Sequence, residues 1–121
     1  MRVQGVKGLP SIGVLRPEAP LDFRTIAELR AAADAARGRG RRTIIMDLSE
    51  TRYINSMGLS ALIALSDALA VDGGLLVLAA ATPKLKVVLN LMGISAVLPL
   101  FGTVVSAVRA VAKRQSAAGS R

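Results

Sequence analysis

The chain has 121 residues, of which 52% are hydrophobic and 20% charged, and this composition predicts a single folded domain with a core of its own. The sequence contains no cysteine and no histidine. Disulfide bonds, thiolate or imidazole metal sites, and catalysis through cysteine or histidine are therefore excluded. Sixteen Lys and Arg against eight Asp and Glu give a formal charge of +8, which by itself favours an anionic partner such as nucleic acid.

The positive charge is unevenly distributed along the chain. Residues 1–52 carry a net charge of +4, residues 53–83 of −2 and residues 84–121 of +6. With two Phe and one Tyr, the chain has almost none of the stacking side chains that bind unpaired bases, so we predict no nucleic-acid partner. The basic residues are instead expected to frame the neutral middle segment and to steer an acidic protein towards it. One basic cluster is interpreted as a solvated turn after a helix, where cations complement the helix dipole: Arg37, Arg39, Arg41 and Arg42.

The sequence gives no sign of export or of a membrane span. Met1 to Gly13 contains Pro10 and no sustained apolar stretch, unlike a secretory signal. Residues 87–108 carry no charge and are long enough to cross a bilayer. Asn90 and Pro99 interrupt this run, and its spacing favours a helix, a short strand and a second helix. We predict a cytoplasmic protein.

Strand and helix signals alternate along the chain. In chain order, the predicted elements are an N-terminal segment at 1–9 that could add an edge strand, a strand at 12–16, a helix from Ile26 to Gly38, a buried strand at 43–48, a helix from Asn55, a buried strand at 75–79, a helix from Pro83 towards Gly93, a short edge strand at 97–100 and a helix from Thr103. Residues 114–121 are expected to form a polar tail, so that the domain proper spans residues 10–113.

Capping residues and apolar stripes give these helices their predicted starts and buried faces. Thr25 and Glu28 fit a capping box, and Thr82 before Pro83 fits an N-cap with proline at the first helical position. Apolar residues at helical spacing predict the buried faces of three helices: Ile26, Leu29, Ala33 and Ala36; Leu59, Leu62, Ile63, Leu69 and Ala70; Val104, Val105, Val108 and Val111.

Alternating strands and helices predict an α/β sandwich with a mixed, mostly parallel sheet of four to five strands and about four helices on its faces. In such sheets, partners and ligands bind beyond the carboxyl ends of the parallel strands. Asp22, Asp47 and the Asn55-Ser56 turn all follow strands, and we therefore expect them to lie in one neighbourhood.

The segment from Ile44 to Leu59 resembles the signature of STAS domains, the family of bacterial anti-sigma factor antagonists. In that family a strand ending in Asp-Leu leads to an Asp-Ser-Ser-Gly-Leu turn, and this chain has Asp47-Leu48 followed by Asn55-Ser56-Met57-Gly58-Leu59. Other features occur in the family's order: Leu21-Asp22 before a helix, Gly73-Gly74 before an apolar strand, and a short strand before the terminal helix. The resemblance covers roughly residues 10 to 113.

The resemblance implies a regulatory protein without cofactor, metal or catalytic residue. It implies that Ser56 is the phosphoacceptor of a partner anti-sigma factor with serine kinase activity, which binds the ATP, and that a phosphatase resets the switch. Asp22, Asp47 and Asn55 are the implied site-shaping residues, and Met57, Gly58 and Leu59 the implied partner-binding residues. Asn55 and Met57 depart from the family pattern, since the family has Asp and Ser at these two positions.

Several alternatives stay open on the sequence. Ser56 could instead be an ordinary capping residue at a helix start. Met57 could instead fill space in the core or lie half-exposed. The chain also resembles single-domain STAS subunits that dock on the ATPase of lipid-transport complexes without a phosphorylation cycle. An enzyme is not expected, because no nucleophile has a base beside it and no Walker-type loop is present. The apolar surface around Met57 leaves a homodimer open.

Overall fold

The computed structural model describes residues 1–119 and contains one five-stranded sheet in the order β1-β2-β3-β4-β5. Strand β1 is antiparallel to β2, and the other neighbouring strands are parallel. The elements are β1 (Val3–Val6), β2 (Leu9–Leu15), α1 (Ile26–Gly38), β3 (Thr43–Asp47), α2 (Ser56–Val71), β4 (Leu75–Ala79), α3 (Pro83–Leu91), the 3-10 helix η1 (Ile94–Ala96), β5 (Leu100–Phe101) and α4 (Val104–Gly119). The predicted α/β class, with a mostly parallel sheet and helices on its faces, is confirmed.

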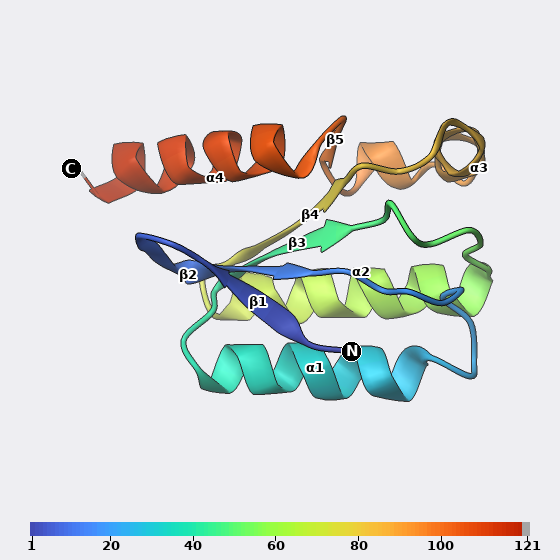
Figure 1. Ribbon diagram of the computed structural model, residues 1–121, viewed down its shortest axis with the longest axis horizontal. Coiled ribbons are helices and arrows are strands. Elements are labelled where there is room, and N and C mark those ends of the chain that lie inside the picture. The colour runs from blue at the N-terminus through green and yellow to red at the C-terminus, as the bar shows by residue number, and fades with distance from the viewer. Residues whose placement is uncertain (120–121) are drawn as a thin grey trace.

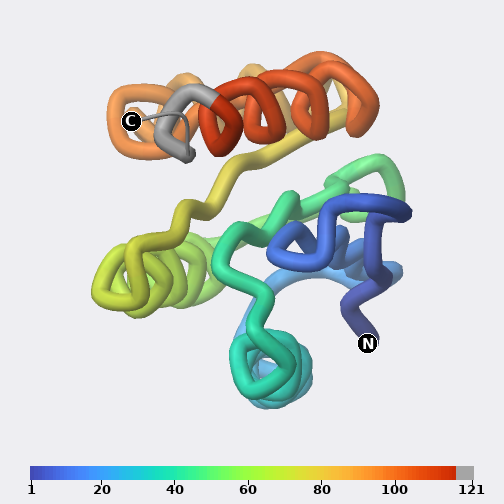
Figure 2. Tube along the Cα trace, turned by 90° about the vertical axis from the view of Figure 1, so that its left-hand side faces the viewer, coloured from blue at the N-terminus to red at the C-terminus, as the bar shows by residue number. Residues whose placement is uncertain are grey.

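The helices cover the sheet on two sides. Figures 1 and 2 show α1 and α2 below the sheet and α4 above it. Side chains alternate between these layers along the central strand: Ile44 and Met46 belong to the core under α1 and α2, whereas Ile45 belongs to the core under α4. Because both faces of β3 are covered, Thr43 to Met46 are all buried, as the continuous apolar run predicted.

Two element boundaries differ from the sequence-based expectation. The last strand is Leu100–Phe101 rather than residues 97–100, and Val97 is exposed. Helix α4 continues to Gly119, through most of the segment expected as a polar tail, while residues 120–121 lie outside the described part. Ser11 on β2 helps to hold this extension, since its hydroxyl donates to the side-chain oxygen of Gln115 at 3.2 Å. No described helix is both long and apolar enough to cross a bilayer.

The predicted buried faces are correct for most positions. Leu29, Ala33, Leu62 and Leu69 are buried. Ala70 and Val105 are exposed instead, whereas Ala61 and Ala107, which were not predicted, are buried.

The predicted capping box at the start of α1 is wrong. The Thr25 hydroxyl donates to the carbonyl of Pro20 at 2.6 Å and makes no cap to the helix. The carbonyl of Asp22 accepts from the amides of Thr25 and Ile26 at 3.1 and 3.2 Å. By contrast, the predicted cap of α3 is confirmed, since the Thr82 hydroxyl accepts from the Leu85 amide at 3.2 Å.

The parallel strands give the domain two distinct ends. Ser56 follows the carboxyl end of β3, whereas the basic turn 39–42 precedes the amino end of β3. Because α1 returns the chain to the start of the sheet, this turn and the carboxy-terminal half of α4 lie at the end opposite Ser56 (Figure 1). The basic turn therefore lies away from the start of α2, although it precedes that helix closely in sequence.

Two arginines of this cluster have structural partners. The Nε of Arg37 lies 3.1 Å from Oδ2 of Asp72, which ties the end of α1 to the end of α2. The Nη1 of Arg41 donates to the carbonyl of Pro10 at 2.6 Å, at the start of β2. These contacts agree with the interpretation of the cluster as a helix-terminal turn.

Candidate functional site

The site is built from two loops that run side by side at the carboxyl end of the sheet. Leu21 and Ile54 form an isolated parallel bridge. The Leu21 amide donates to the carbonyl of Tyr53 at 2.9 Å, and the Asn55 amide donates to the carbonyl of Leu21 at 3.2 Å. Leu21 and Ile54 are both buried, so the bridge also has an apolar anchor. The loop before α1 is thereby fixed against the start of α2.

Gly58 allows the start of α2 to pack closely against Leu21. A Cβ on Gly58 would overlap the carbonyl oxygen of Leu21 and would lie 2.7 Å from its carbonyl carbon. Real Cβ atoms do not approach backbone this closely, so the first turn of α2 can rest on Leu21 only if residue 58 is glycine. Gly58 therefore has a packing role that is independent of any partner.

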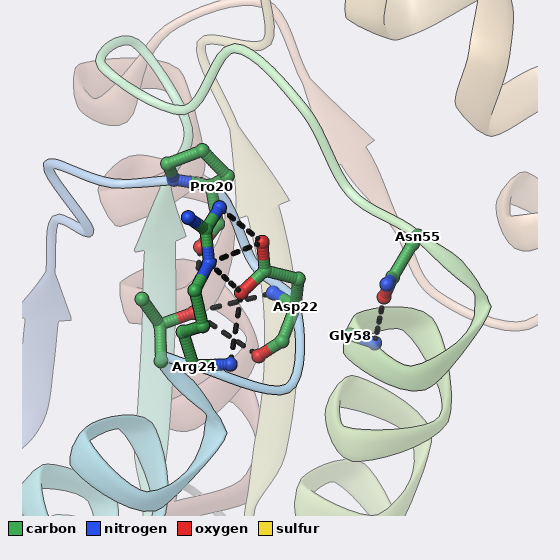
Figure 3. Close-up of polar contacts among 6 residues, drawn as sticks. Pro20, Asp22, Arg24, Asn55 and Gly58 are labelled. Carbon is green, nitrogen blue, oxygen red and sulfur yellow. Dashed lines mark hydrogen bonds and ion pairs between the residues drawn. The ribbon is translucent and has the colours of Figure 1, made fainter.

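Asn55 caps helix α2. Its backbone is extended, with φ −96° and ψ −178°, and its side-chain oxygen accepts from the Gly58 amide at 2.9 Å (Figure 3). Its carbonyl accepts from the Leu59 amide at 2.9 Å. Asn is among the preferred N-cap residues, and this is the geometry in which such a residue satisfies a free helical amide.

Ser56 is the first residue of α2 and is exposed. Since Asn55 supplies the cap, the interpretation of Ser56 as a capping residue is not what the structure shows. Within residues 1–119, the Ser56 hydroxyl takes part in none of the side-chain hydrogen bonds. Its hydroxyl is thus accessible and is not needed to hold the helix start.

Asp22 lies beside this junction and is 6% exposed. Its carboxylate accepts from the backbone amide of Arg24 at 2.9 Å and from Nη2 of Arg24 at 2.8 Å (Figure 3). The hydrogen bond from the Arg24 side chain contributes most to lowering the pKa of Asp22, and the bond from the Arg24 backbone amide comes second. The hydrogen bond to Asp22 in turn raises the pKa of Arg24. Asp22 is therefore a fixed anion that holds the loop before α1.

Asp47 is the last residue of β3 and is half-buried. Its carboxylate accepts from the Ser49 amide at 3.0 Å and lines a different cavity, together with Arg16 and Glu28. Along β3, Met46 belongs to the core under α1 and α2, whereas Asp47 pairs with Ala79, which belongs to the core under α4. The structure brings the loop of Asp22 against the cap residue Asn55, while Asp47 lines a cavity of its own.

An open groove runs from Ser56 between α1 and α2. It has a volume of about 620 Å3. Its lining is mostly apolar and small, and consists of Phe23, Ile26, Ala27, Arg30, Ser56, Met57, Ser60, Ala61 and Ala64. Phe23 is 69% exposed and Met57 is 54% exposed, so two large apolar side chains face solvent at the Ser56 end of the groove. Such side chains are typical of a contact surface for another protein.

The three predicted partner-binding residues differ in their accessibility. Met57 is exposed, Gly58 is buried and Leu59 is half-buried against the main core. Phe23 and Arg30 were not predicted. Phe23 could have been identified because it directly follows Asp22. Arg30 could have been identified because it lies on the exposed side of α1.

No cation-binding cluster is gathered at this site. Among the described residues, no three His, Cys, Asp or Glu side chains come together in a way that could hold a metal ion. The chemistry that the site offers is a free hydroxyl at a helix start, an adjacent apolar groove and a fixed carboxylate.

Comparisons with known proteins agree with the fold. The family model of the STAS domain matches residues 5–107, and none of the curated proteins compared with the chain matches it. An anti-sigma factor antagonist from Mycobacterium paratuberculosis is 25% identical, with a TM-score of 0.76 and 90% of each chain covered. The anti-sigma factor antagonist SpoIIAA of Bacillus, in its unphosphorylated form, is 20% identical, with a TM-score of 0.74 over 92% of this chain and 96% of that chain.

Similar domains also occur inside transporters. The murine anion transporter Solute Carrier 26 family member A9 is 20% identical, with a TM-score of 0.71. The match covers 83% of this chain and 17% of the transporter chain. The fold described here therefore occurs both as a free-standing antagonist and as one part of a larger transporter.

Proposed function

Because the chain belongs to the STAS domain family, whose model matches residues 5–107, we propose that it is a cytoplasmic regulator of the anti-sigma factor antagonist type. In this proposal it binds an anti-sigma factor that is also a serine kinase, and phosphorylation of Ser56 releases it. The supporting observation is the spare hydroxyl of Ser56, which is exposed while Asn55 caps the helix. Bacillus SpoIIAA, which shares the fold, has been solved in phosphorylated and unphosphorylated forms.

A phosphate on Ser56 would be compatible with helix α2. The first amides of a helix have no partner within the helix, and the helix dipole favours negative charge at this end. Asn55 occupies the amides of Gly58 and Leu59, which leaves those of Ser56 and Met57 nearest to a phosphate. Phosphorylation would then change the surface without unfolding the helix.

The partner would dock over the Ser56 end of the groove. Phe23 and Met57 offer exposed apolar area there, and the groove continues along Ala27 and Ala64. A phosphate at the rim adds nearly two negative charges, and removing them from water costs several kcal/mol. That cost exceeds the contribution of a typical interface residue, so the phosphorylated chain would bind poorly.

Asp22 and Asn55 shape the site through the backbone. Asp22 holds the loop before α1 through Arg24, and Asn55 holds the start of α2. The Asp22 carboxylate and the Asn55 side-chain amide can position these segments without touching the phosphate. Asp47 lines a different cavity and has no part in the proposed mechanism.

Phosphate mapping tests the proposal. The chain is incubated with ATP and an extract of its source cells, and phosphate is located by mass spectrometry. Label on Ser56 is expected, with loss of label in Ser56→Ala and retention in Ser60→Ala. Ser60 is the matched control because it is exposed in the same groove one turn later. Label that persists in Ser56→Ala would refute Ser56 as the phosphoacceptor.

Binding by charge variants tests the release step. Ser56→Asp should weaken the complex with the anti-sigma factor, and Ser56→Ala should leave it nearly intact. If both variants bind as the unchanged chain does, Ser56 does not lie at the interface.

A second candidate function is the one implied by the resemblance to STAS subunits of lipid-transport complexes. The same apolar groove could hold the chain on a transporter ATPase, as an accessory subunit with no phosphorylation cycle. Co-purification separates the two functions, since an anti-sigma factor supports the first and a transporter ATPase the second.

A further inference from the structure

A second cavity lies at the end of the sheet opposite Ser56. It has a volume of about 420 Å3, between the amino ends of β3 and β4 and the carboxy-terminal half of α4. Its polar lining includes Ser11, Arg42, Thr43, Gly74, Arg114 and Gln115. We call this cavity the α4 cleft. Its volume is within the range of small-molecule sites.

The α4 cleft carries positive charge that no described acid opposes. Arg42 and Arg114 are exposed, and neither forms an ion pair with another of the described residues. The acid next to the cleft in sequence is Asp72, which is engaged by Arg37 at 3.1 Å. Residues 84–121 contain no Asp or Glu at all. The two guanidinium groups therefore keep their hydrogen-bond donors available for an anion.

The walls of the cleft are held in place. The Ser11 hydroxyl donates to Gln115 at 3.2 Å, which ties α4 to β2 beside the opening. The Arg42 amide donates to the carbonyl of Ser11 at 2.9 Å, and its carbonyl accepts from the Leu75 amide at 3.1 Å. A Cβ on Gly74 would overlap the carbonyl of Arg42, so residue 74 has to be glycine for the two backbones to lie this close. Arg42 thus projects from a fixed main chain.

We propose that the α4 cleft binds a small, soluble, phosphate-bearing anion between Arg42 and Arg114. Guanidinium groups match phosphate oxygens with two parallel hydrogen bonds, and such charge-assisted bonds are about twice as strong as neutral ones. The competing explanation is that both arginines only complement the carboxyl ends of the nearby helices. That explanation predicts an effect on stability and none on anion binding.

Titration with sodium pyrophosphate at low ionic strength tests the proposal. Calorimetry measures the affinity, and amide chemical shifts locate the binding site. Shifts are expected at Thr43, Gly74 and Gln115. Arg42→Gln and Arg114→Gln should each weaken binding about tenfold. Arg109→Gln is the control, because it removes the same charge from an exposed position of α4 that does not line the cleft. It should change the affinity less than twofold.

Three outcomes would overturn the proposal. The first is no shift at the cleft residues, and the second is equal weakening by Arg109→Gln, which would indicate only a general charge effect. The third is binding to vesicles of anionic lipid without binding to pyrophosphate. Ser56→Ala should bind pyrophosphate normally, so failure at this cleft is distinguishable from failure of the proposed switch.

Discussion

The backbone of Gly58, in the first turn of α2, lies against the carbonyl group of Leu21, so closely that a Cβ on Gly58 would sit 2.7 Å from the carbonyl carbon. The same Leu21 carbonyl accepts the Asn55 amide, and Asn55 in turn caps Gly58. One contact thus positions both the loop that contains Asp22 and the helix start that contains Ser56.

Gly58→Ala should destabilise the fold by about 1–3 kcal/mol, because the methyl group forces α2 away from Leu21. Urea unfolding measures this change. Gly38→Ala is the matched control, since Gly38 also lies in a helix but nothing lies within 4 Å of its added Cβ. The control should be neutral or stabilise by up to about 1 kcal/mol. Equal effects of the two variants would show that the close approach to Leu21 does not matter.

Asn55→Ala should cost about 1 kcal/mol of stability, because the Gly58 amide loses its cap. Asn55→Asp should keep the cap and add a favourable charge at the helix start. Ser56→Ala should change the unfolding free energy by less than about 0.5 kcal/mol, since Ser56 does not cap the helix. If Ser56→Ala lost more stability than Asn55→Ala, the result would show that Asn55 is not the residue that caps α2.

The pKa of Asp22 is lowered from 3.8 by the hydrogen bonds from Arg24, so ionised Asp22 stabilises the folded state. This contribution is present above the ordinary pKa and is lost as the pH falls through the lowered one. Asp22→Asn should therefore reduce the loss of stability on acidification below pH 3.8. Urea unfolding at several acidic pH values provides the measurement, with exposed Glu50→Gln as control. An unchanged pH profile in Asp22→Asn would contradict the assignment.

Met57→Ala should weaken binding of the anti-sigma factor at least about fivefold, because its exposed side chain is expected to be buried by the partner. Val71→Ala is the control at the other end of the same helix, where the side chain is 86% exposed. It should leave the affinity unchanged. Calorimetric titration of both variants compares them directly, and a larger effect of Val71 would move the docking surface away from Ser56.

Local signals in the sequence were sufficient for much of this fold. The continuous apolar runs of β3 and β4 were predicted correctly, as was the Thr82 cap, because each depends only on residues a few positions away. The Thr25 cap failed for a physical reason. Its hydroxyl donates to the Pro20 carbonyl, and that contact depends on how the preceding loop closes.

The site was only partly predictable. Asn55 and Ser56 could be placed at a helix start from the sequence. The exposure of Phe23 and the contact between Gly58 and Leu21 depend on how α1 and α2 pack, which no local pattern encodes. The same holds for the α4 cleft, which is lined by Arg42 and Arg114 from distant parts of the chain.

The central claim is that phosphorylation of Ser56 separates this chain from its partner. Its most direct test is a calorimetric titration of the anti-sigma factor with the unmodified chain and with a chain carrying phosphoserine at position 56. We predict that the unmodified chain binds and that the phosphorylated chain binds at least about 100-fold more weakly, which corresponds to the desolvation of the added charge. Equal affinities of the two forms would contradict the account.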